Sequence, residues 1–260
     1  MIAGTPAGIS LSPEGGAHQS LKTPLIGMSQ SGLASFEPAY ADELAVIMAW
    51  GFDYMQRDGG NIVKDGSSSA DDTGGSVYLR LSTRTIAQQT REMTADLAHG
   101  IVSGGYWMTA PASKADVVIA YTGAVAPEAI EAAKQLNANG VSTALLSVTS
   151  AGRLHSGWTS AAHQRRRKHT SKPSHIEELL ATLPRDCAIL TVLDGHPAAL
   201  GWLGSVLGHR TTALGVEAFG ESGTIADLYA IHSIDTASIV EAAQELVPPR
   251  ANQKHRLKAS

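Results

Sequence analysis

The segment DVVIAYTGAVAPEAIEAAKQL, residues 116–136, gives the clearest indication of the fold class. It opens with Asp116 to Tyr121, a largely apolar run that is typical of a strand buried on both faces of a sheet. Thr122-Gly123 then allows a turn, and Pro127 lies where the first turn of a helix tolerates proline. One stripe of that helix carries apolar side chains at helical spacing, namely Ala129, Ile130, Ala133 and Leu136. The segment therefore predicts a strand-turn-helix unit.

The same order of strand and helix recurs three times downstream. Such alternation predicts a mainly parallel sheet covered on both faces, because right-handed crossovers place helices over each face. We therefore predict an α/β domain over residues 110–247, preceded by a connector at 89–109 and followed by a polar, basic tail at 248–260. The predicted strands cover residues 141–148, 188–193 and 211–216, and the predicted helices cover 176–181, 197–207, 224–231 and 237–246.

Residues 1–88, before the connector, carry fewer signals of regular structure. Residues 4–32 are rich in Gly, Pro and Ser without a sustained period, which predicts irregular surface chain. The stretch from Pro38 to Met55 predicts an amphipathic helix, because its apolar residues recur at helical spacing. A polar, Gly-rich loop at 58–75 then leads into an alternating strand over Ser76 to Ser82.

Composition excludes several classes of function. The 260 residues are 43% hydrophobic and 17% charged, and 20 Lys and Arg against 24 Asp and Glu give a net charge of -4. This balance disfavours nucleic acid as a partner, and no segment has the roughly 20 consecutive apolar residues of a membrane helix. A single cysteine, Cys187, excludes an internal disulfide and favours a cytoplasmic location. No Cys/His cluster has the spacing of a zinc site, so no metal site is predicted.

The loop PEGGAHQS, residues 13–20, is the first candidate for chemistry. Glu14, His18 and Gln19 place a carboxylate, an imidazole and an amide beside glycines that allow a ligand to approach closely. Such a cluster can move protons on a small polar substrate. Composition alone favours the simpler interpretation, a loop held by its own hydrogen bonds.

Four other segments carry polar groups, and a structural interpretation competes with a functional one at each. Asp194 to Pro197 follows a predicted strand, at the sheet edge that binds ligands, but it also suits a tight turn before a helix. Phe219 to Gly223 precedes a helix and is interpreted as a helix cap. Arg80 and Arg84 can pair with a carboxylate or phosphate, although arginines at a strand end are usually solvated. The basic run Arg165 to Lys168 is interpreted as a solvated loop.

Six segments, taken in order, resemble the transketolase superfamily, and most closely the homodimeric type of pyruvate dehydrogenase E1 component. GISLSPEGGAHQS, TPLIGMSQSGLASFEPAYADELAVIMAWGFDYMQRD and GGSVYLRLSTR are similar to the family's pyrimidine-binding domain. IAYTGAVAPEAIEAAKQL, LTVLDGHP and FGESGTIADLYAIHSID are similar to its C-terminal domain. The resemblance implies part of a thiamine-diphosphate-binding pyrimidine domain of α/β fold, followed by a transketolase C-terminal-like α/β domain with a mainly parallel sheet.

The resemblance also implies a reaction and residues for it. The family uses thiamine diphosphate and Mg²⁺ to decarboxylate a 2-oxo acid such as pyruvate, and then acylates a lipoyl group on an E2 acyltransferase. The segment from Gly15 to Gln19 resembles a transketolase loop whose histidine contacts substrate, which implies catalytic roles for His18 and Glu14 and a substrate-binding role for Gln19. Arg84 lies near the position of an arginine that binds sugar phosphate.

Other parts of the family pattern have no counterpart in the sequence. The Gly-Asp-Gly motif that binds magnesium is absent, and the glutamate that activates the cofactor is expected before residue 1. We therefore expect no cofactor binding and no activity from this chain alone, and a homodimer or a complementary N-terminal E1 chain as partner. Transketolase-type transfer of a two-carbon unit and a non-catalytic dimerisation module are the alternatives.

Overall fold

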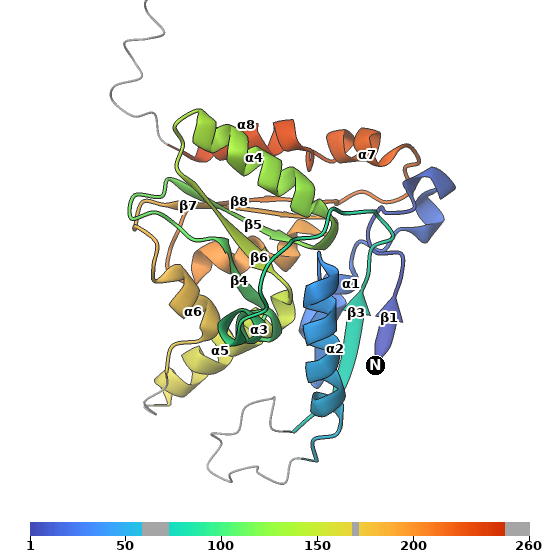
Figure 1. The fold of residues 1–260 in the computed structure, drawn as a ribbon, viewed down its shortest axis with the longest axis vertical. Coiled ribbons are helices and arrows are strands. Elements are labelled where there is room, and N and C mark those ends of the chain that lie inside the picture. The colour runs from blue at the N-terminus through green and yellow to red at the C-terminus, as the bar shows by residue number, and fades with distance from the viewer. Residues whose placement is uncertain (59–72, 168–171, 248–260) are drawn as a thin grey trace, which may run out of the picture.

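A five-stranded sheet forms the centre of the protein (Figure 1). The computed structural model describes residues 1–58, 73–167 and 172–247, apart from the side chains of Ser12 and His18. β5, β6, β7 and β8 are parallel to their neighbours, whereas β4 runs antiparallel to β6. In spatial order the strands are β4 (Gly105–Thr109), β6 (Thr143–Val148), β5 (Val117–Thr122), β7 (Ala188–Leu193) and β8 (Thr211–Leu214).

Helices cover both faces of this sheet. In Figure 1, α4 (Ala126–Ala138) and α8 (Thr236–Leu246) lie above it, beside α7 (Ile225–Ile231). On the opposite face lie α5 (Ala151–Arg166) and α6 (His175–Leu180). We call the sheet with these helices the C-terminal lobe.

The strands of the C-terminal lobe are buried on both faces, as their apolar sequences require. All six residues of β5 are buried. Its odd-numbered residues, such as Ile119, pack in the core under α4 and α8, and its even-numbered residues, such as Val118, pack in the core on the side of α5 and α6. The strand therefore separates two apolar cores.

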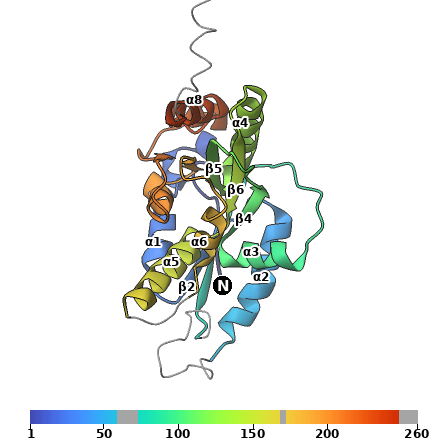
Figure 2. The same ribbon diagram turned by 90° about the vertical axis from the view of Figure 1, so that its left-hand side faces the viewer.

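A smaller parallel sheet forms the N-terminal lobe. Its strand order is β1-β3-β2, with β1 (Ile2–Gly4), β3 (Ser76–Arg80) and β2 (Leu33–Phe36). Figure 2 shows α2 (Ala41–Met55) on one side of this sheet and α1 (Thr23–Ser29) on the other, where α5 of the C-terminal lobe also contacts β2.

The chain between the two lobes is an extended segment that leads into α3 (Ala95–Ser103) and then β4. The range predicted as a connector, residues 89–109, thus contains a helix and the antiparallel edge strand of the larger sheet. Among the helices in the described residues, none is long and apolar enough to cross a membrane.

The structure confirms the predicted α/β class with mainly parallel sheets, and it corrects several local predictions. The helix predicted over 197–207 is two 3₁₀ helices, Pro197–Ala199 and Gly201–Ser205, because Gly204 lies against Thr211 too closely for a regular helix with side chains. The sequence analysis missed α5, which buries only Leu154 and Ala161 and so lacks a clear apolar stripe.

Two predicted loops are also partly regular. Residues 4–32 contain α1 and two 3₁₀ helices, and Ile9 is fully buried in the core under α4. Arg165 and Arg166 lie in the last turn of α5, where Arg165 forms an ion pair with Glu177 at 2.6 Å. Lys168 lies outside the described residues.

Replacing Ile119 with alanine tests the central core. Ile119 is 0% exposed, so Ile119→Ala is expected to lower the free energy of unfolding by about 2–5 kcal/mol through lost burial and a residual cavity. Ile231 is 59% exposed and serves as the control. Ile231→Ala is expected to change the free energy of unfolding by less than about 0.5 kcal/mol. Urea unfolding followed by circular dichroism measures both, and similar losses for the two variants would contradict this description of the core.

Candidate functional site

The carboxyl ends of strands from both lobes meet at one place. Arg80 ends β3 and Glu37 directly follows β2 in the N-terminal lobe, whereas Asp194 directly follows β7 in the C-terminal lobe. In the larger sheet, β6 and β7 lie on opposite sides of β5. The chain leaves β5 toward β6 on one side and leaves β7 toward β8 on the other, so the two connections run in opposite directions. Open α/β sheets bind ligands at such a switch point. In this protein, the N-terminal lobe places the charged side chains of Arg80 and Glu37 at the switch point.

These three side chains form a buried cluster, which we call the triad. Arg80 is 2% exposed and forms an ion pair with Glu37. The second terminal nitrogen of Arg80 donates hydrogen bonds to the carbonyl oxygens of Ser20, at 2.9 Å, and Asp194. The Asp194 carboxylate accepts from the backbone N–H of Ile9 at 3.0 and 3.2 Å. The triad therefore joins both lobes to the segment that contains Ile9 and Ser20.

Burial raises the pKa of both acids in the triad. For Glu37, burial raises the pKa to about 7 against the opposing effect of Arg80, and the nearby Asp194 raises it further. For Asp194, burial raises the pKa to about 6, again against the effect of Arg80. A single guanidinium between two acids balances one negative charge, so the site favours retention of a proton.

Two glycines leave room for the carboxylates. Gly8 has φ +56, and a Cβ atom there would lie 2.2 Å from Cγ of Asp194. Gly123 has φ +60, and a Cβ atom there would lie 2.7 Å from Oε1 of Glu37. Both positions need the left-handed backbone that glycine tolerates and the absence of a side chain.

The loop predicted as the first candidate site begins and ends beside the triad. Gly8 and Ser20 pair across its base through the Ser20 N–H and the Gly8 oxygen at 3.2 Å. Glu14 is exposed at the end of the 3₁₀ helix Ser12–Glu14. The backbone of His18 lies in the 3₁₀ helix Gly16–His18, and its side chain is outside the described residues. We call residues 8–20 the site loop.

Gln19 and Gly16 attach the second half of the site loop to the C-terminal lobe. The side-chain N–H of Gln19 donates to the carbonyl oxygen of Glu221 at 2.7 Å, and its side-chain oxygen accepts from the backbone N–H of Gly220 at 3.4 Å. A Cβ atom on Gly16 would lie 2.2 Å from Cα of Gly220, so the two backbones are in close contact. The structure therefore brings together the site loop, the turn at Asp194 and the segment 219–223, which are far apart in the sequence.

Arg84, the fourth predicted site residue, is already paired. Its guanidinium donates to both carboxylate oxygens of Glu128, at 2.8 and 2.6 Å, and to the carbonyl oxygen of Ala124. It also lies 5.0 Å from the ring centroid of Tyr229. A substrate phosphate at Arg84 would compete with Glu128.

The local interpretation of Asp194 to Pro197 as a turn is confirmed. Pro197 begins a 3₁₀ helix, and His196 caps it by accepting from the backbone N–H of Ala198 at 3.2 Å. The carboxylate of Asp194 is nevertheless 1% exposed and part of the triad, which the sequence analysis did not foresee.

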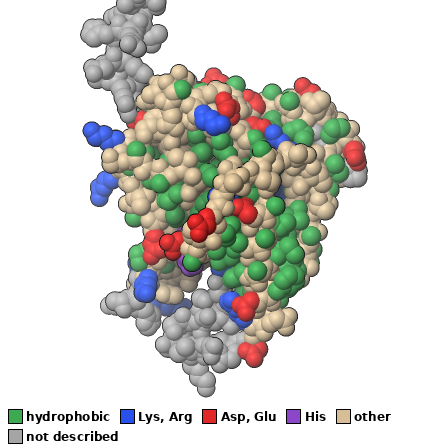
Figure 3. Space-filling view, in the orientation of Figure 1, with side chains coloured by type: hydrophobic (Ala, Val, Ile, Leu, Met, Phe, Trp, Pro, Cys, Tyr) green, Lys and Arg blue, Asp and Glu red, His purple; other side chains and the backbone are tan. Residues whose placement is uncertain are grey.

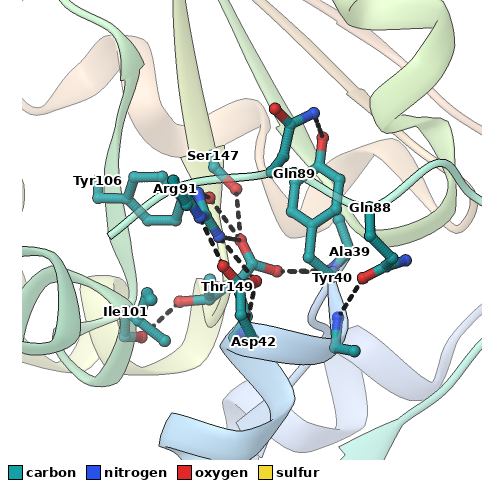
Figure 4. A network of polar contacts seen from close by, with 12 residues as sticks. Ala39, Tyr40, Asp42, Gln88, Gln89, Arg91, Ile101, Tyr106, Ser147 and Thr149 are labelled. Atoms are coloured by element: carbon teal, nitrogen blue, oxygen red, sulfur yellow. Dashed lines mark hydrogen bonds and ion pairs between the residues drawn. The ribbon is translucent and has the colours of Figure 1, made fainter. Parts of the chain in front are cut away.

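A second buried polar network, missed by the sequence analysis, joins α2 to β4 (Figure 4). Glu43 is 0% exposed and accepts from the hydroxyl of Tyr106 at 2.6 Å and from the backbone N–H of Tyr40 at 3.0 Å. Burial raises the pKa of Glu43. Arg91 donates to the Asp42 carboxylate and to the Tyr106 hydroxyl. The signal that could have found Glu43 is its position three residues after the N-cap residue Tyr40, where a glutamate caps the first turn.

The described residues do not build a metal centre from their own side chains. They contain no group of three or more His, Cys, Asp or Glu side chains that could hold a metal ion. A small cavity beside the triad is lined mainly by apolar or neutral residues, with Arg80 and Glu37 as its charged members. No step of a reaction is therefore assigned to a cofactor bound by these residues alone.

A family model described as the transketolase-like TK C-terminal domain matches residues 104–235. The chain belongs to this family. The matched residues include β4 to β8 and the turn that carries Asp194. No curated protein matches the sequence.

Solved transketolase structures share the fold. The transketolase of Leishmania mexicana matches with a TM-score of 0.66 and 17% identity, over 97% of this chain and 32% of its own. A transketolase mutant from Pichia stipitis matches with a TM-score of 0.62 and 20% identity, over 94% of this chain and 29% of its own. A split gene transketolase described as an inactive beta4 tetramer matches with a TM-score of 0.56 and 17% identity, over 94% of this chain and 65% of its own. This transketolase-like chain thus spans about a third of the length of the first two.

Replacing Gly8 with alanine tests how the transketolase-like domain holds the site loop. Gly8→Ala is expected to lower the free energy of unfolding by about 3 kcal/mol. About 1 kcal/mol of this comes from strain in the left-handed backbone, and the rest comes from the collision of the new Cβ atom with Asp194. Gly32 is the matched control, because it has φ +74 and a Cβ atom there would have nothing within 4 Å. Gly32→Ala is expected to cost about 1 kcal/mol from strain alone. Equal losses in urea unfolding would show that Asp194 does not occupy this position.

Proposed function

We propose that this chain supplies the C-terminal part of a thiamine-diphosphate-dependent 2-oxo acid dehydrogenase, of the pyruvate dehydrogenase E1 type. The observation that carries the proposal is the placement of the site loop: both lobes hold the loop with Glu14, His18 and Gln19 at the carboxyl ends of the strands. Open α/β sheets use this edge for ligands. The segments of sequence that resemble E1 components give the proposal its reaction class.

In the proposed enzyme, His18 forms a hydrogen bond to the substrate near the reacting carbon, and Glu14 assists it. A positioned acid or base contributes about 10²- to 10⁴-fold to a rate. Gln19 acts through its hydrogen bonds to residues 220 and 221, which orient the loop, as well as through any contact with substrate. Thiamine diphosphate supplies the carbanion chemistry in this family, and its ligands are expected from a complementary N-terminal chain. A lipoyl group on an acyltransferase is the expected acceptor.

Transketolase-type transfer between sugar phosphates is the alternative within enzymes. It is favoured by the solved structures of similar fold, which are transketolases. The pairing of Arg84 with Glu128 weighs against it, because that arginine is the candidate for a sugar phosphate. Preference for a ketose phosphate as donor, without decarboxylation of a 2-oxo acid, would decide for transketolase chemistry.

Reconstitution tests the E1 proposal. Adding a separately encoded N-terminal chain is expected to restore pyruvate-dependent dye reduction, and calorimetry is expected to show that thiamine diphosphate and Mg²⁺ bind only to the combined chains. His18→Ala is then expected to lower the rate by well over tenfold, because a positioned acid or base is lost. The exposed His163 on α5 is the control, and His163→Ala is expected to leave the rate unchanged. Equal rates for the two variants would remove His18 from the mechanism.

Self-association of the chain is a second candidate function. In Figure 3, hydrophobic side chains gather over α2, β1 and β3. Phe52 on α2 is 54% exposed and Ile2 on β1 is 60% exposed. Apolar patches of this kind mark interaction sites, and α2 is apolar on more than its buried side. A second copy of this chain is the proposed occupant, because the split gene transketolase of similar fold is described as a tetramer of its beta chain.

Sedimentation velocity of the full chain tests self-association. The wild-type chain is expected to sediment as a dimer or larger species, and Phe52→Asp is expected to yield monomers because it places a charge in the apolar interface. Phe219→Asp is the matched control, since Phe219 is 65% exposed but lies in the segment that contacts the site loop. A monomeric wild-type chain, or dissociation by both variants alike, would count against the α2 surface.

A further inference from the structure

The base of the site loop is held by the charged groups of the triad. On one side, the Ile9 N–H donates to the Asp194 carboxylate. On the other side, Arg80 donates to the Ser20 carbonyl oxygen at 2.9 Å. Both ends of the loop therefore depend on side chains that come from different lobes. We call these contacts the base contacts.

The hydrogen bonds that the described side chains of Gln19 and Ser10 make outside the base contacts are between neutral groups. Gln19 binds the backbone of residues 220 and 221, and the hydroxyl of Ser10 lies 2.6 Å from the hydroxyl of Ser82. Hydrogen bonds between neutral groups of this kind do not change their charge near neutral pH. A change in the charge of the triad would therefore act on the loop through its base contacts.

We propose that Glu37, Arg80 and Asp194 form a proton-sensitive latch, which holds the base of the site loop between the two lobes and releases it when both carboxyl groups are ionised. The latch is a property of this chain alone. Its significance for catalysis rests on the proposed function, because only there does the position of the loop matter for a reaction.

The charge balance of the triad is the physical basis of the latch. With one carboxyl group protonated, Arg80 neutralises the other, and the buried site carries no net charge. With both ionised, one negative charge lies in a site where Arg80, Glu37 and Asp194 are between 1% and 8% exposed. An uncompensated buried charge is costly. Opening the loop breaks the hydrogen bond from the Ile9 N–H, which favours ionised Asp194, but it also admits water to the uncompensated charge. Burial has the larger effect on the pKa of Asp194, so ionisation favours the open loop.

The other groups that face the triad leave this balance unchanged. Arg84, from the segment after β3, and Glu128, on α4, act on Asp194 in opposite directions and neutralise each other. Burial raises the pKa of Tyr229 on α7, beside Asp194, and of Tyr78 on β3, beside Arg80 and Glu37, so both stay neutral. The cavity beside the triad receives only uncharged residues from α1, α5 and the 3₁₀ helix at 197–199: Pro24, Ala151, Gly152 and Ala199.

The direction of the pH dependence follows from these pKa values. In the closed loop, burial raises the pKa to about 7 for Glu37 and to about 6 for Asp194, whereas both acids in the open loop titrate near their ordinary values. The closed loop therefore binds protons more tightly and is favoured at low pH. It loses this advantage as the pH rises from near the ordinary carboxyl pKa to about 7.

Hydrogen exchange of the full chain tests the latch. Protection factors of the backbone amides in residues 8–20, corrected for the intrinsic effect of pH, are expected to fall at least about tenfold between pH 5 and pH 8. Residues 117–122, in the buried strand β5, give the internal reference and are expected to change less. The reference separates local opening of the loop from global unfolding.

Three variants distinguish the latch from a purely structural contact. Glu37→Gln and Asp194→Asn keep an acceptor oxygen but cannot ionise, and each is expected to reduce the fall in loop protection to under about threefold. Glu177→Gln is the control, because Glu177 pairs with Arg165 away from the loop. The fall in loop protection of this variant between pH 5 and pH 8 is expected to match that of the wild type. A flat wild-type profile, a parallel change in β5, or an undiminished fall in both triad variants would overturn the proposal. Failure of reconstitution with an N-terminal chain would affect only the proposed function.

Discussion

The buried guanidinium of Arg80 holds the two lobes in their observed arrangement. It lies between Glu37 of its own lobe and Asp194 of the other, and it donates to the backbone of both the site loop and the C-terminal lobe. A charge this deeply buried is tolerable only with its partners present, because loss of one partner from a buried ion pair typically costs about 3–5 kcal/mol. Arg80 therefore adds a polar constraint to the apolar contacts that hold the lobes together.

This constraint extends to the backbone around the triad. Gly8 and Gly123 approach the carboxylates of Asp194 and Glu37 so closely that a side chain at either position would collide with them. The site loop leaves from Gly8 and returns at Ser20, so the same contacts that join the lobes also fix the loop. Residues 9–19 consequently lie at the carboxyl ends of the strands of the larger sheet, held from both sides. A functional loop on a rigid scaffold is the usual way in which α/β proteins position reactive groups.

The candidate site is assembled from both lobes of this transketolase-like chain. The C-terminal lobe contributes Asp194 and the segment at 219–223, and the N-terminal lobe contributes the loop with Glu14 and His18. The described residues contain no group of three or more His, Cys, Asp or Glu side chains that could hold a metal ion. The same structure exposes apolar side chains over α2 and β1, on a surface distinct from the site. Catalysis and association can therefore be separated by experiment.

The order of residues along the chain was enough to predict the fold class and most of the larger sheet. The apolar runs that became β5, β6 and β7 are buried on both faces, and a strand of this kind can be recognised locally because nearly every residue in it must be apolar. The sequence also pointed to the site loop through Glu14, His18 and Gln19. It did not reveal α5, whose few buried residues leave no apolar stripe. The burial of Glu37, Glu43 and Asp194 emerged only from the folded chain, since the burial of a polar residue depends on partners that are distant in the sequence. Arg80 illustrates the reason: it looked like a solvated arginine at a strand end, and it became the centre of the site because the other lobe brought Asp194 to it.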